Sequence, residues 1–271
     1  MKDELTKKQE GSSNGNTALA VGQNEIDRMF GNAKLQIPVD APLPMVKILR
    51  ETPMFELPDG QTIKELVGHI IYWHNANQYY SKAFGEGETV IPDCFSSDGI
   101  NPDGGTDPQV RPCKDCEYNK YGSATDGNGK ACSNTIRLYL LIDGDVIPVL
   151  LKASPSSLGK KESLMKWLTN APNIAAKAGC GTAYQPIKVK FTLHKKDFTS
   201  GFSASVLDLA TVKVLNPANE TEMAEIKKLA ILTTQFKEAY LGLGKVSQYM
   251  AQEAPDAAET VPAEQQDEVP I

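Results

Sequence analysis

Alternating apolar and polar residues predict most of the strands in this chain. Between Ile187 and Leu193, apolar side chains alternate with Lys188, Lys190 and Thr192. A period of two buries one face of a strand and leaves the basic face in solvent. Similar β-prone runs occupy residues 45–49, 66–84, 136–142, 146–151 and 202–215, and the run at 66–84 is long enough for one or two strands.

Two later segments have the periodicity of helices. Ser154-Pro155 suits the start of the first helix, whose buried face would hold Leu158, Leu164, Met165, Trp167 and Leu168. Residues 220–240 place apolar side chains along one side of a second helix. These elements predict a β-rich α+β fold: an OB-like small barrel or a curled antiparallel sheet with two late helices.

The two ends of the chain differ in composition from this body. Residues 1–33 are rich in Gly, Ser, Asn and charge, and residues 251–271 hold six acidic and no basic side chains. Segments with so few apolar residues are typically disordered. We therefore expect a disordered arm over 1–33, one domain over 34–250 and a disordered acidic tail over 251–271.

Neither a membrane span nor a secretory leader is visible. No run of about 18 apolar residues occurs, and the first residues, Met1 to Leu5, are charged. We expect a cytoplasmic protein, in a reducing compartment where thiols stay available for metal.

Four of the five cysteines lie in an insert over residues 92–133. Cys113 and Cys116 form a C-x2-C knuckle, with Cys94 18 residues before it and Cys132 15 residues after it. Zinc prefers four soft ligands in a tetrahedron, and thiolates at such spacings supply them. The insert has few apolar side chains, so a metal would offset the entropy of ordering it. We expect one structural Zn²⁺ per chain; buried or disulfide-bonded cysteines are the alternative.

The net charge of −6 is unevenly distributed. Without the tail, basic and acidic residues balance at 28 each, and residues 111–213 alone carry a net charge of +7. A basic half fits an anionic partner, and a separate acidic tail fits a competitor for the same surface or a signal for partner proteins. Ordinary surface charge is the alternative.

The basic half also contains aromatic residues, and this combination suits single-stranded nucleic acid. Cations bind the phosphates, and each base stacked on an aromatic ring contributes about 1–3 kcal/mol. The candidate contacts are Arg111, Lys114, Lys120, Tyr121, Lys130, Arg137, Tyr139, Lys152, Lys188, Lys190, Lys195 and Lys196.

No catalytic constellation is visible in the sequence. His69 and His74 do not have the H-E-x-x-H spacing of a zinc hydrolase, and on a regular strand they would face opposite sides. Cys180 lies between two glycines without an identifiable helper. We therefore expect a non-catalytic protein. The alternatives are a zinc-ribbon interaction module in transcription or assembly, and a zinc-dependent nuclease.

Several short motifs together resemble those of a family of phage and prophage proteins with a four-cysteine insert in front of a β-rich core. The motifs are Ile91-Pro92-Asp93-Cys94, Cys113-Lys114-Asp115-Cys116, Tyr121-Gly122-Ser123, Gly127 to Cys132, Arg137-Leu138 and Pro155-Ser156-Ser157-Leu158. The resemblance covers about residues 35–215. It implies a single-stranded-DNA-binding protein of the OB class that serves DNA replication or recombination in a bacterial host cell.

The end of the tail also resembles the tail tip of bacterial single-stranded-DNA-binding proteins. Such tips end in an acidic run, an apolar residue, Pro and Phe, and recruit replication and repair proteins. Here the tip is Asp267-Glu268-Val269-Pro270-Ile271, with a shorter acidic run and a final Ile in place of Phe. The resemblance implies partner recruitment through residues 267–271, and the departures put the usual partners in question.

Overall fold

The computed structural model describes residues 43–49, 52–81, 91–125, 127, 129–198 and 203–241. The expected arm over 1–33, the acidic tail over 251–271 and its tip, Asp267 to Ile271, lie outside these residues. The strands are β1 (Met45–Ile48), β2 (Phe55–Glu56), β3 (Thr62–Ile63), β4 (Glu65–Tyr79), β5 (Cys94–Ser96), β6 (Cys132–Ile142), β7 (Val149–Ala153), β8 (Ile187–Asp197) and β9 (Ser203–Val214). The long helices are α2 (Ser163–Lys177) and α3 (Glu220–Phe236), and α3 continues into a π-helical turn, η4 (Lys237–Leu241).

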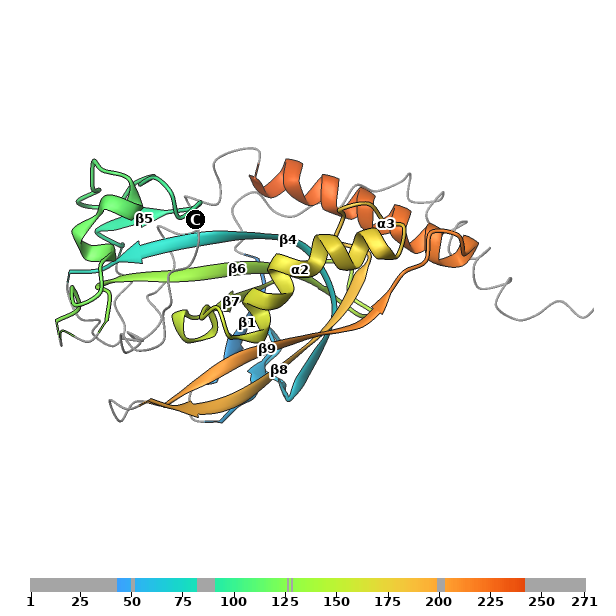
Figure 1. Cartoon of the computed structure of the whole chain (residues 1–271), viewed down its shortest axis with the longest axis horizontal. Coiled ribbons are helices and arrows are strands. Elements are labelled where there is room, and N and C mark those ends of the chain that lie inside the picture. Colours follow the sequence, from blue (N-terminus) through green and yellow to red (C-terminus); the bar gives the residue numbers. More distant parts are fainter. Residues whose placement is uncertain are drawn as a thin grey trace, which may run out of the picture. The chain divides into compact units, whose positions relative to one another are not determined.

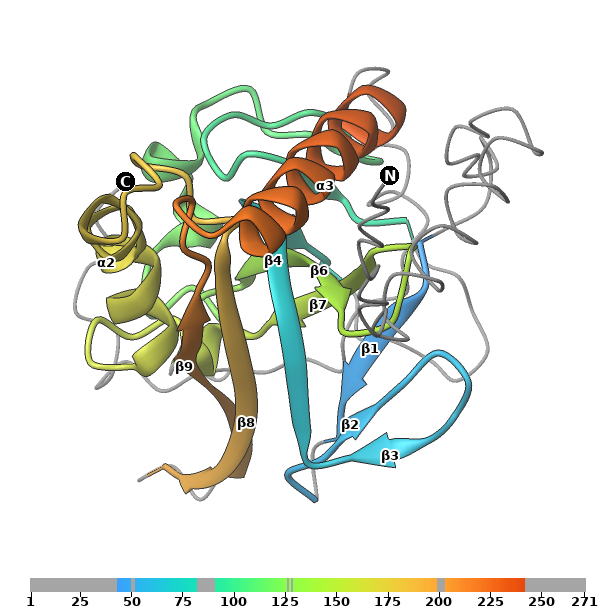
Figure 2. The same ribbon diagram turned by 90° about the vertical axis from the view of Figure 1, so that its right-hand side faces the viewer.

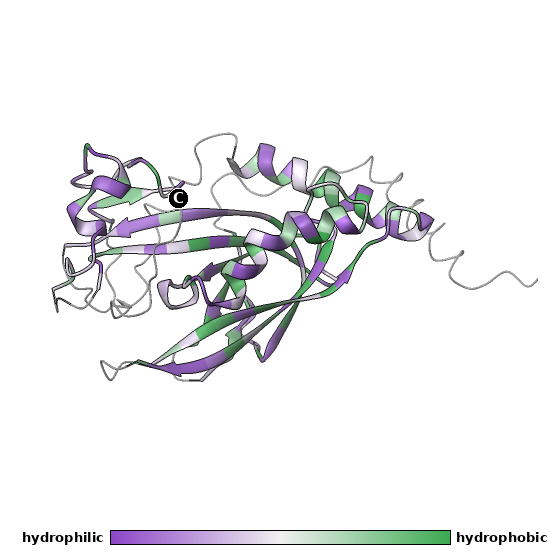
Figure 3. Ribbon diagram, in the orientation of Figure 1, coloured by the Kyte–Doolittle hydropathy of each residue, from purple (hydrophilic) through white to green (hydrophobic). Residues whose placement is uncertain are grey.

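The strands form one curled sheet, a half-barrel, in the order β3-β2-β1-β7-β6-β4-β8-β9, and β5 pairs with β4 (Figure 1). Neighbouring strands are antiparallel except β1 and β7, which are parallel. Hydrophobic and hydrophilic residues alternate along the long strands (Figure 3). The predicted curled, mostly antiparallel sheet with two late helices is confirmed.

The β4–β6 ladder is the backbone of this architecture. Its pairing runs from Gly68–Ile142 to Tyr79–Cys132. The other edge of β4 pairs with β8 in its first half and with β5 at its end. One end of the ladder therefore belongs to the half-barrel, and the other end carries the cysteine insert (Figure 1).

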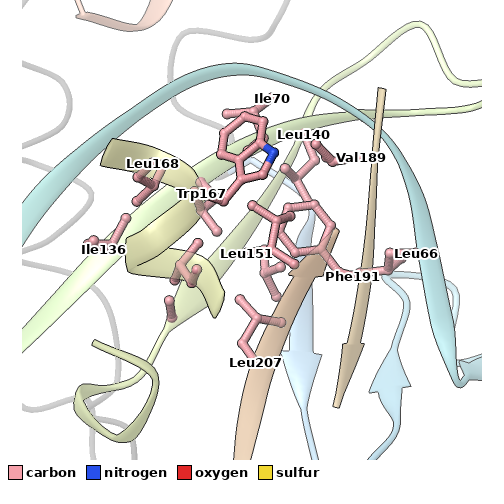
Figure 4. Packing of buried hydrophobic residues seen from close by; sticks show 14 of the residues in the cluster. Leu66, Ile70, Ile136, Leu140, Leu151, Trp167, Leu168, Val189, Phe191 and Leu207 are labelled. Atoms are coloured by element: carbon pink, nitrogen blue, oxygen red, sulfur yellow. The ribbon is translucent and has the colours of Figure 1, made fainter. Parts of the chain in front are cut away.

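The hydrophobic core lies on the concave face of the sheet, under α2. Trp167 of α2 packs among Ile70, Leu140 and Val189 from three different strands (Figure 4). The indole N–H donates to the Thr211 hydroxyl over 2.9 Å, so the one polar atom of this side chain is satisfied. As the sequence indicated, Trp167 is a core residue.

Helix α3 lies against the opposite, convex face, which we call the outer face. The two helices are well separated, with β4 next to α3 (Figure 2). The fully described turns of α3 bury Leu229, Thr233 and Phe236, and none of these belongs to the core cluster. None of the helices in the described ranges is both long and apolar enough to cross a bilayer.

Two sequence-based expectations about local structure are wrong, and the structure adds two short strands that the sequence did not predict. The first helix begins at Ser163, because Pro155–Ser157 forms a separate 3-10 turn, η3. The connection after Glu51 contains β2 and β3, joined at a turn in which Gly60 has a positive φ of 84°. The returning strand predicted from Val146 begins only at Val149.

A β-bulge changes which side chains of β4 share a face. The register with β6 shifts between Ile70 and Tyr72, so His69 pairs with Leu141 and His74 pairs with Arg137. Leu141 and Arg137 are four residues apart on a regular stretch of β6 and therefore point the same way. His69 and His74 both face outward, contrary to the expectation from strict alternation, because the extra residue resets the period.

Candidate functional site

The cysteine insert is attached to the end of the β4–β6 ladder. Tyr79, at the end of β4, pairs with Cys94 of β5 on one side and with Cys132 of β6 on the other. Paired residues share a face of the sheet, so both cysteines point to the same side. Cys113 and Cys116 flank a single 3-10 turn, η1 (Cys113–Asp115), and the Cys113 amide donates to the Ile100 carbonyl over 2.8 Å.

The structure brings all four cysteines of the insert to one pocket. Cys94, Cys113, Cys116 and Cys132 line it, all four are buried, and none is in a disulfide. Tyr79 and Tyr118 also line this pocket, with their rings stacked 4.0 Å apart. The four cysteines therefore lie around one pocket with no disulfide between them; their role as metal ligands stays a prediction.

The donor set suits a soft metal ion, but the side chains are not yet in the arrangement of bound ligands. In the described part of the chain, no three His, Cys, Asp or Glu side chains are placed to hold an ion together. Burial, and then the neighbouring Cys113 and Cys116, raise the pKa of Cys94 and of Cys132. A cation among these sulfurs would favour the thiolates, so the chemistry fits zinc if the side chains turn inward together.

Aspartate side chains hold the loops of the insert in addition to any metal. Asp98 accepts from the amides of Ile100 and Asn101 over 2.6 and 3.0 Å. Asp93 accepts from the Ser81 amide and the Thr106 hydroxyl. Burial raises the pKa of Asp93 and of Asp98, but these hydrogen bonds outweigh it and lower both values. The carboxylates act as loop acceptors, a source of order that the sequence did not reveal.

The outer face of the sheet carries two basic residues side by side. Arg137 of β6 pairs with Lys152 of β7, and on its other side with His74 of β4. Tyr139 lies two residues along from Arg137 on the same face, paired with Tyr72. We call this set of five residues the cationic–aromatic face.

The cationic–aromatic face is covered rather than exposed. Arg137 and Tyr139 are 0% exposed and Lys152 is 9% exposed. The Tyr139 ring lies 4.9 Å from that of Phe236 and 5.3 Å from that of Tyr240, measured between centroids. The C-terminal part of α3 and η4 therefore lies over the aromatic members of this face, Tyr139 and Tyr72.

The remaining candidate contacts divide into two groups. Three lysines of β8 already pair with carboxylates: Lys188 with Asp143 at 2.7 Å, Lys190 with Glu65 at 3.1 Å, and Lys196 with Glu162 at 2.7 Å. Lys130 donates to two asparagine side chains and lies over the Tyr121 ring at 5.2 Å. The exposed candidates are Arg111, Lys114, Lys120, Tyr121 and Lys195, and of these Arg111 lies 3.8 Å from the Glu117 carboxylate.

No family model, curated protein or solved structure matches this chain. The resemblance to phage single-stranded-DNA-binding proteins therefore remains a hypothesis, and the function has to be argued from the site.

Two features of the site escaped the sequence analysis. His74 lies in the cationic–aromatic face because of the bulge before Tyr72, and the sequence assigned it no binding role. Phe236 and Tyr240 contact this face from α3 and η4, and the sequence did not single them out as a pair. Their spacing of four, which aligns two rings on a helix face, was the available signal.

Proposed function

We propose that this protein binds single-stranded DNA without catalysis, and that its binding surface is the cationic–aromatic face. The observation that carries the proposal is the facing pair of Arg137 and Lys152, with Tyr139 and His74 beside it. Two cations at paired positions on one face can bind successive phosphates, and a nucleic-acid backbone supplies such anions in series.

The aromatic members of the face favour an unpaired strand over a duplex. A base can stack on a ring only if it is free of its own stack, and single-strand binding proteins combine such rings with a cationic track. Tyr72, His74 and Tyr139 lie on the same face as the Arg137–Lys152 pair: His74 pairs with Arg137, and the Tyr72–Tyr139 pair is the next pair along the same face. The exposed cations of the insert, Arg111, Lys114 and Lys120, would extend the track beyond the sheet.

The shape of the sheet supports an OB-like reading of the fold. OB-folds are small, partly open barrels that bind oligonucleotides across the outer surface of their strands. Here β9, at one end of the strand order, approaches the third strand from the other end: the Ser205 hydroxyl of β9 donates to the Leu49 carbonyl just after β1 over 2.8 Å. The side chains of α2 pack against the concave side of the sheet.

In this proposal Cys94, Cys113, Cys116 and Cys132 hold one structural zinc ion. The ion would supply cross-links between loops of the insert and no reactive position, since four thiolates complete its coordination. The support is the shared pocket and the burial of all four free thiols.

The cellular role follows from the same proposal. The protein would protect unpaired DNA during replication or recombination of a phage or mobile element, in the cytoplasm of a bacterial host. The acidic tail, with its tip at Asp267 to Ile271, would recruit replication or recombination proteins or compete for the cationic surface.

Fluorescence anisotropy of labelled oligonucleotides tests the proposal. We expect preferential binding of single strands that weakens as salt rises. The Lys152→Gln variant should weaken binding several-fold and lower the slope of log K against log salt by about 0.7, the value for one phosphate contact. Lys166→Gln, at an exposed position on α2, loses the same charge away from the surface and should match the wild type.

Each other result points to a different protein. Absence of binding at low salt would favour a zinc-ribbon interaction module. Degradation of the oligonucleotide would favour a zinc-dependent nuclease. Equal effects of the two lysine variants would remove the cationic–aromatic face as the binding surface.

A further inference from the structure

Three rings of the outer face form a continuous aromatic platform. The centroids of Tyr72, His74 and Tyr139 are 5.7 to 5.8 Å apart, and the planes are tilted by only 21° to 34°. His74 is fixed by two hydrogen bonds: Nδ1 lies 2.8 Å from the Asn75 carbonyl, and Nε2 lies 2.9 Å from the Tyr139 hydroxyl. A carbonyl only accepts, so Nδ1 donates to it, and in the neutral ring Nε2 accepts from the tyrosine.

The C-terminal part of α3 with η4 places two stacked rings on this platform. Phe236 and Tyr240 are stacked on each other with centroids 5.2 Å apart and an interplanar angle of 21°. Both contact Tyr139. Next to them, the Lys237 ammonium lies 5.4 Å from the centroid of the Tyr72 ring. Two stacked bases on this platform would lie as Phe236 and Tyr240 do, next to a cation that could bind their phosphates.

The two ends of α3 are held in different ways. At the N-terminal end, Asn219 caps the helix by accepting from the Glu222 amide over 3.1 Å, and Glu222 pairs with Lys213 at 2.7 Å. Towards the C-terminal end, ring contacts with Tyr139 and the cation–π contact of Lys237 with Tyr72 join the helix to the sheet. In the described residues α3 also continues into a π turn, a geometry that is rare in proteins overall and occurs frequently at functional sites. Ring contacts of this kind can be exchanged for contacts with other flat rings, such as bases, while the cap and the ion pair at the N-terminal end stay in place.

We propose that Tyr139, Tyr72 and His74 are a base-stacking site, and that Phe236 and Tyr240 occupy it as stand-ins for bases until single-stranded DNA displaces them. This inference rests on the proposed function and specifies its site. Tyr139 has no exposed surface in the covered state, so bases reach it only after the turn lifts. The core is unaffected by this movement, because the core cluster contains no residue of α3 or η4.

DNA can bind only to molecules in which the platform is open. The apparent affinity is therefore the intrinsic affinity multiplied by the fraction of open molecules. We therefore expect the double variant Phe236→Ala, Tyr240→Ala to bind a labelled oligo(dT) tighter by about threefold or more than the wild type. Ile231→Ala is the matched control, since Ile231 lies on α3 with 57% exposure and away from the buried stripe. It should leave affinity unchanged. Weaker binding by the double variant would overturn the inference, since the two rings would then be part of the DNA contact.

Hydrogen exchange of the full-length wild type provides a test without substitutions. On adding oligo(dT), amides of residues 233–241 should exchange faster and amides around Tyr139 in β6 should exchange more slowly. Greater protection of 233–241 in the complex would contradict displacement.

The two proposals fail in distinguishable ways. If neither the wild type nor the double variant binds single strands, the proposed function is wrong. If the wild type binds, but affinity and exchange of 233–241 do not respond, DNA binds elsewhere and only the stacking site is wrong.

Discussion

His69 is a buried side chain whose environment favours the neutral ring. It is 4% exposed, and its Nδ1 lies 2.8 Å from the Gln185 carbonyl, to which it donates. Its Nε2 faces the Glu225 carboxylate at 3.6 Å. Burial lowers the pKa of His69, and the Gln185 hydrogen bond and the Glu225 charge offset this only in part, while Lys188 lowers it further and Asp143 raises it.

This environment predicts a loss of stability on mild acidification. Between the lowered pKa of the folded state and about 6.5, the unfolded chain binds a proton that the folded chain does not. The free energy of unfolding should therefore fall as pH decreases below about 6.5, by at most about 1.4 kcal/mol per pH unit for this group. Urea unfolding of the wild type and of His69→Gln at several pH values between about 7.5 and 5 measures how the free energy of unfolding depends on pH. Equal slopes for the two proteins would contradict this account.

Single residues also show what the sequence was able to predict about the site. The four cysteines were identified because their spacing and their chemistry are both local. The ion pair of Lys190 could not be predicted from the sequence. Its partner Glu65 lies 125 positions away and becomes a neighbour only through the β4–β8 pairing. Charge counting along a chain does not reveal such neutralisation, so the basic half is less cationic in space than in sequence.

At the scale of elements, periodicity located the long strands and missed their interruptions. The alternation at residues 187–193 matches the first part of β8, where Ile187, Val189 and Phe191 join the core. The bulge before Tyr72 is invisible to alternation, because an extra residue in a uniformly β-prone run carries no separate signal. That one shift moves His74 onto the face with Arg137.

Serine hydroxyls accept hydrogen bonds from amides on the edge of β9 that has no neighbouring strand in the described ranges. Substituting one of these serines tests how much the contact stabilises the fold. The Leu207 amide donates to the Ser157 hydroxyl over 2.9 Å, and the Leu209 amide donates to the Ser163 hydroxyl over 3.0 Å. Both acceptors come from the segment that leads into α2, so they join the helix to the edge strand. An edge with unpaired amides would otherwise invite pairing with another chain.

Ser157→Ala should destabilise the protein by about 1–3 kcal/mol, because it leaves a buried amide without an acceptor. Chemical denaturation measures this change. Ser154→Ala is the matched control: it lies in the same turn, and its hydroxyl pairs with that of Ser156 rather than with the strand. A loss of stability as large in the control as in Ser157→Ala would show that the turn itself, not the edge contact, matters.

At the scale of the whole molecule, the β4–β6 ladder joins two parts that are stabilised differently. The half-barrel has an apolar core with α2 inside it, and that core includes no residue of the insert. The insert depends on aspartate hydrogen bonds, the Tyr79–Tyr118 stack and the proposed metal. The two parts should therefore respond separately to loss of the ion.

The fifth cysteine makes a control for the metal within the same chain. Cys180 lies far from the insert in sequence, and its thiol donates to the Leu215 carbonyl over 3.3 Å. Purified wild type and Cys180→Ser should each contain about one zinc per chain by elemental analysis, whereas Cys113→Ser should contain almost none. In Cys113→Ser, amides of residues 91–125 should exchange faster while those of β8 and β9 keep their protection, because the core under α2 does not need the ion. A wild type that is free of metal and still protects the insert would show that the aspartates and the tyrosine stack are sufficient, and the four thiols would then be buried cysteines only.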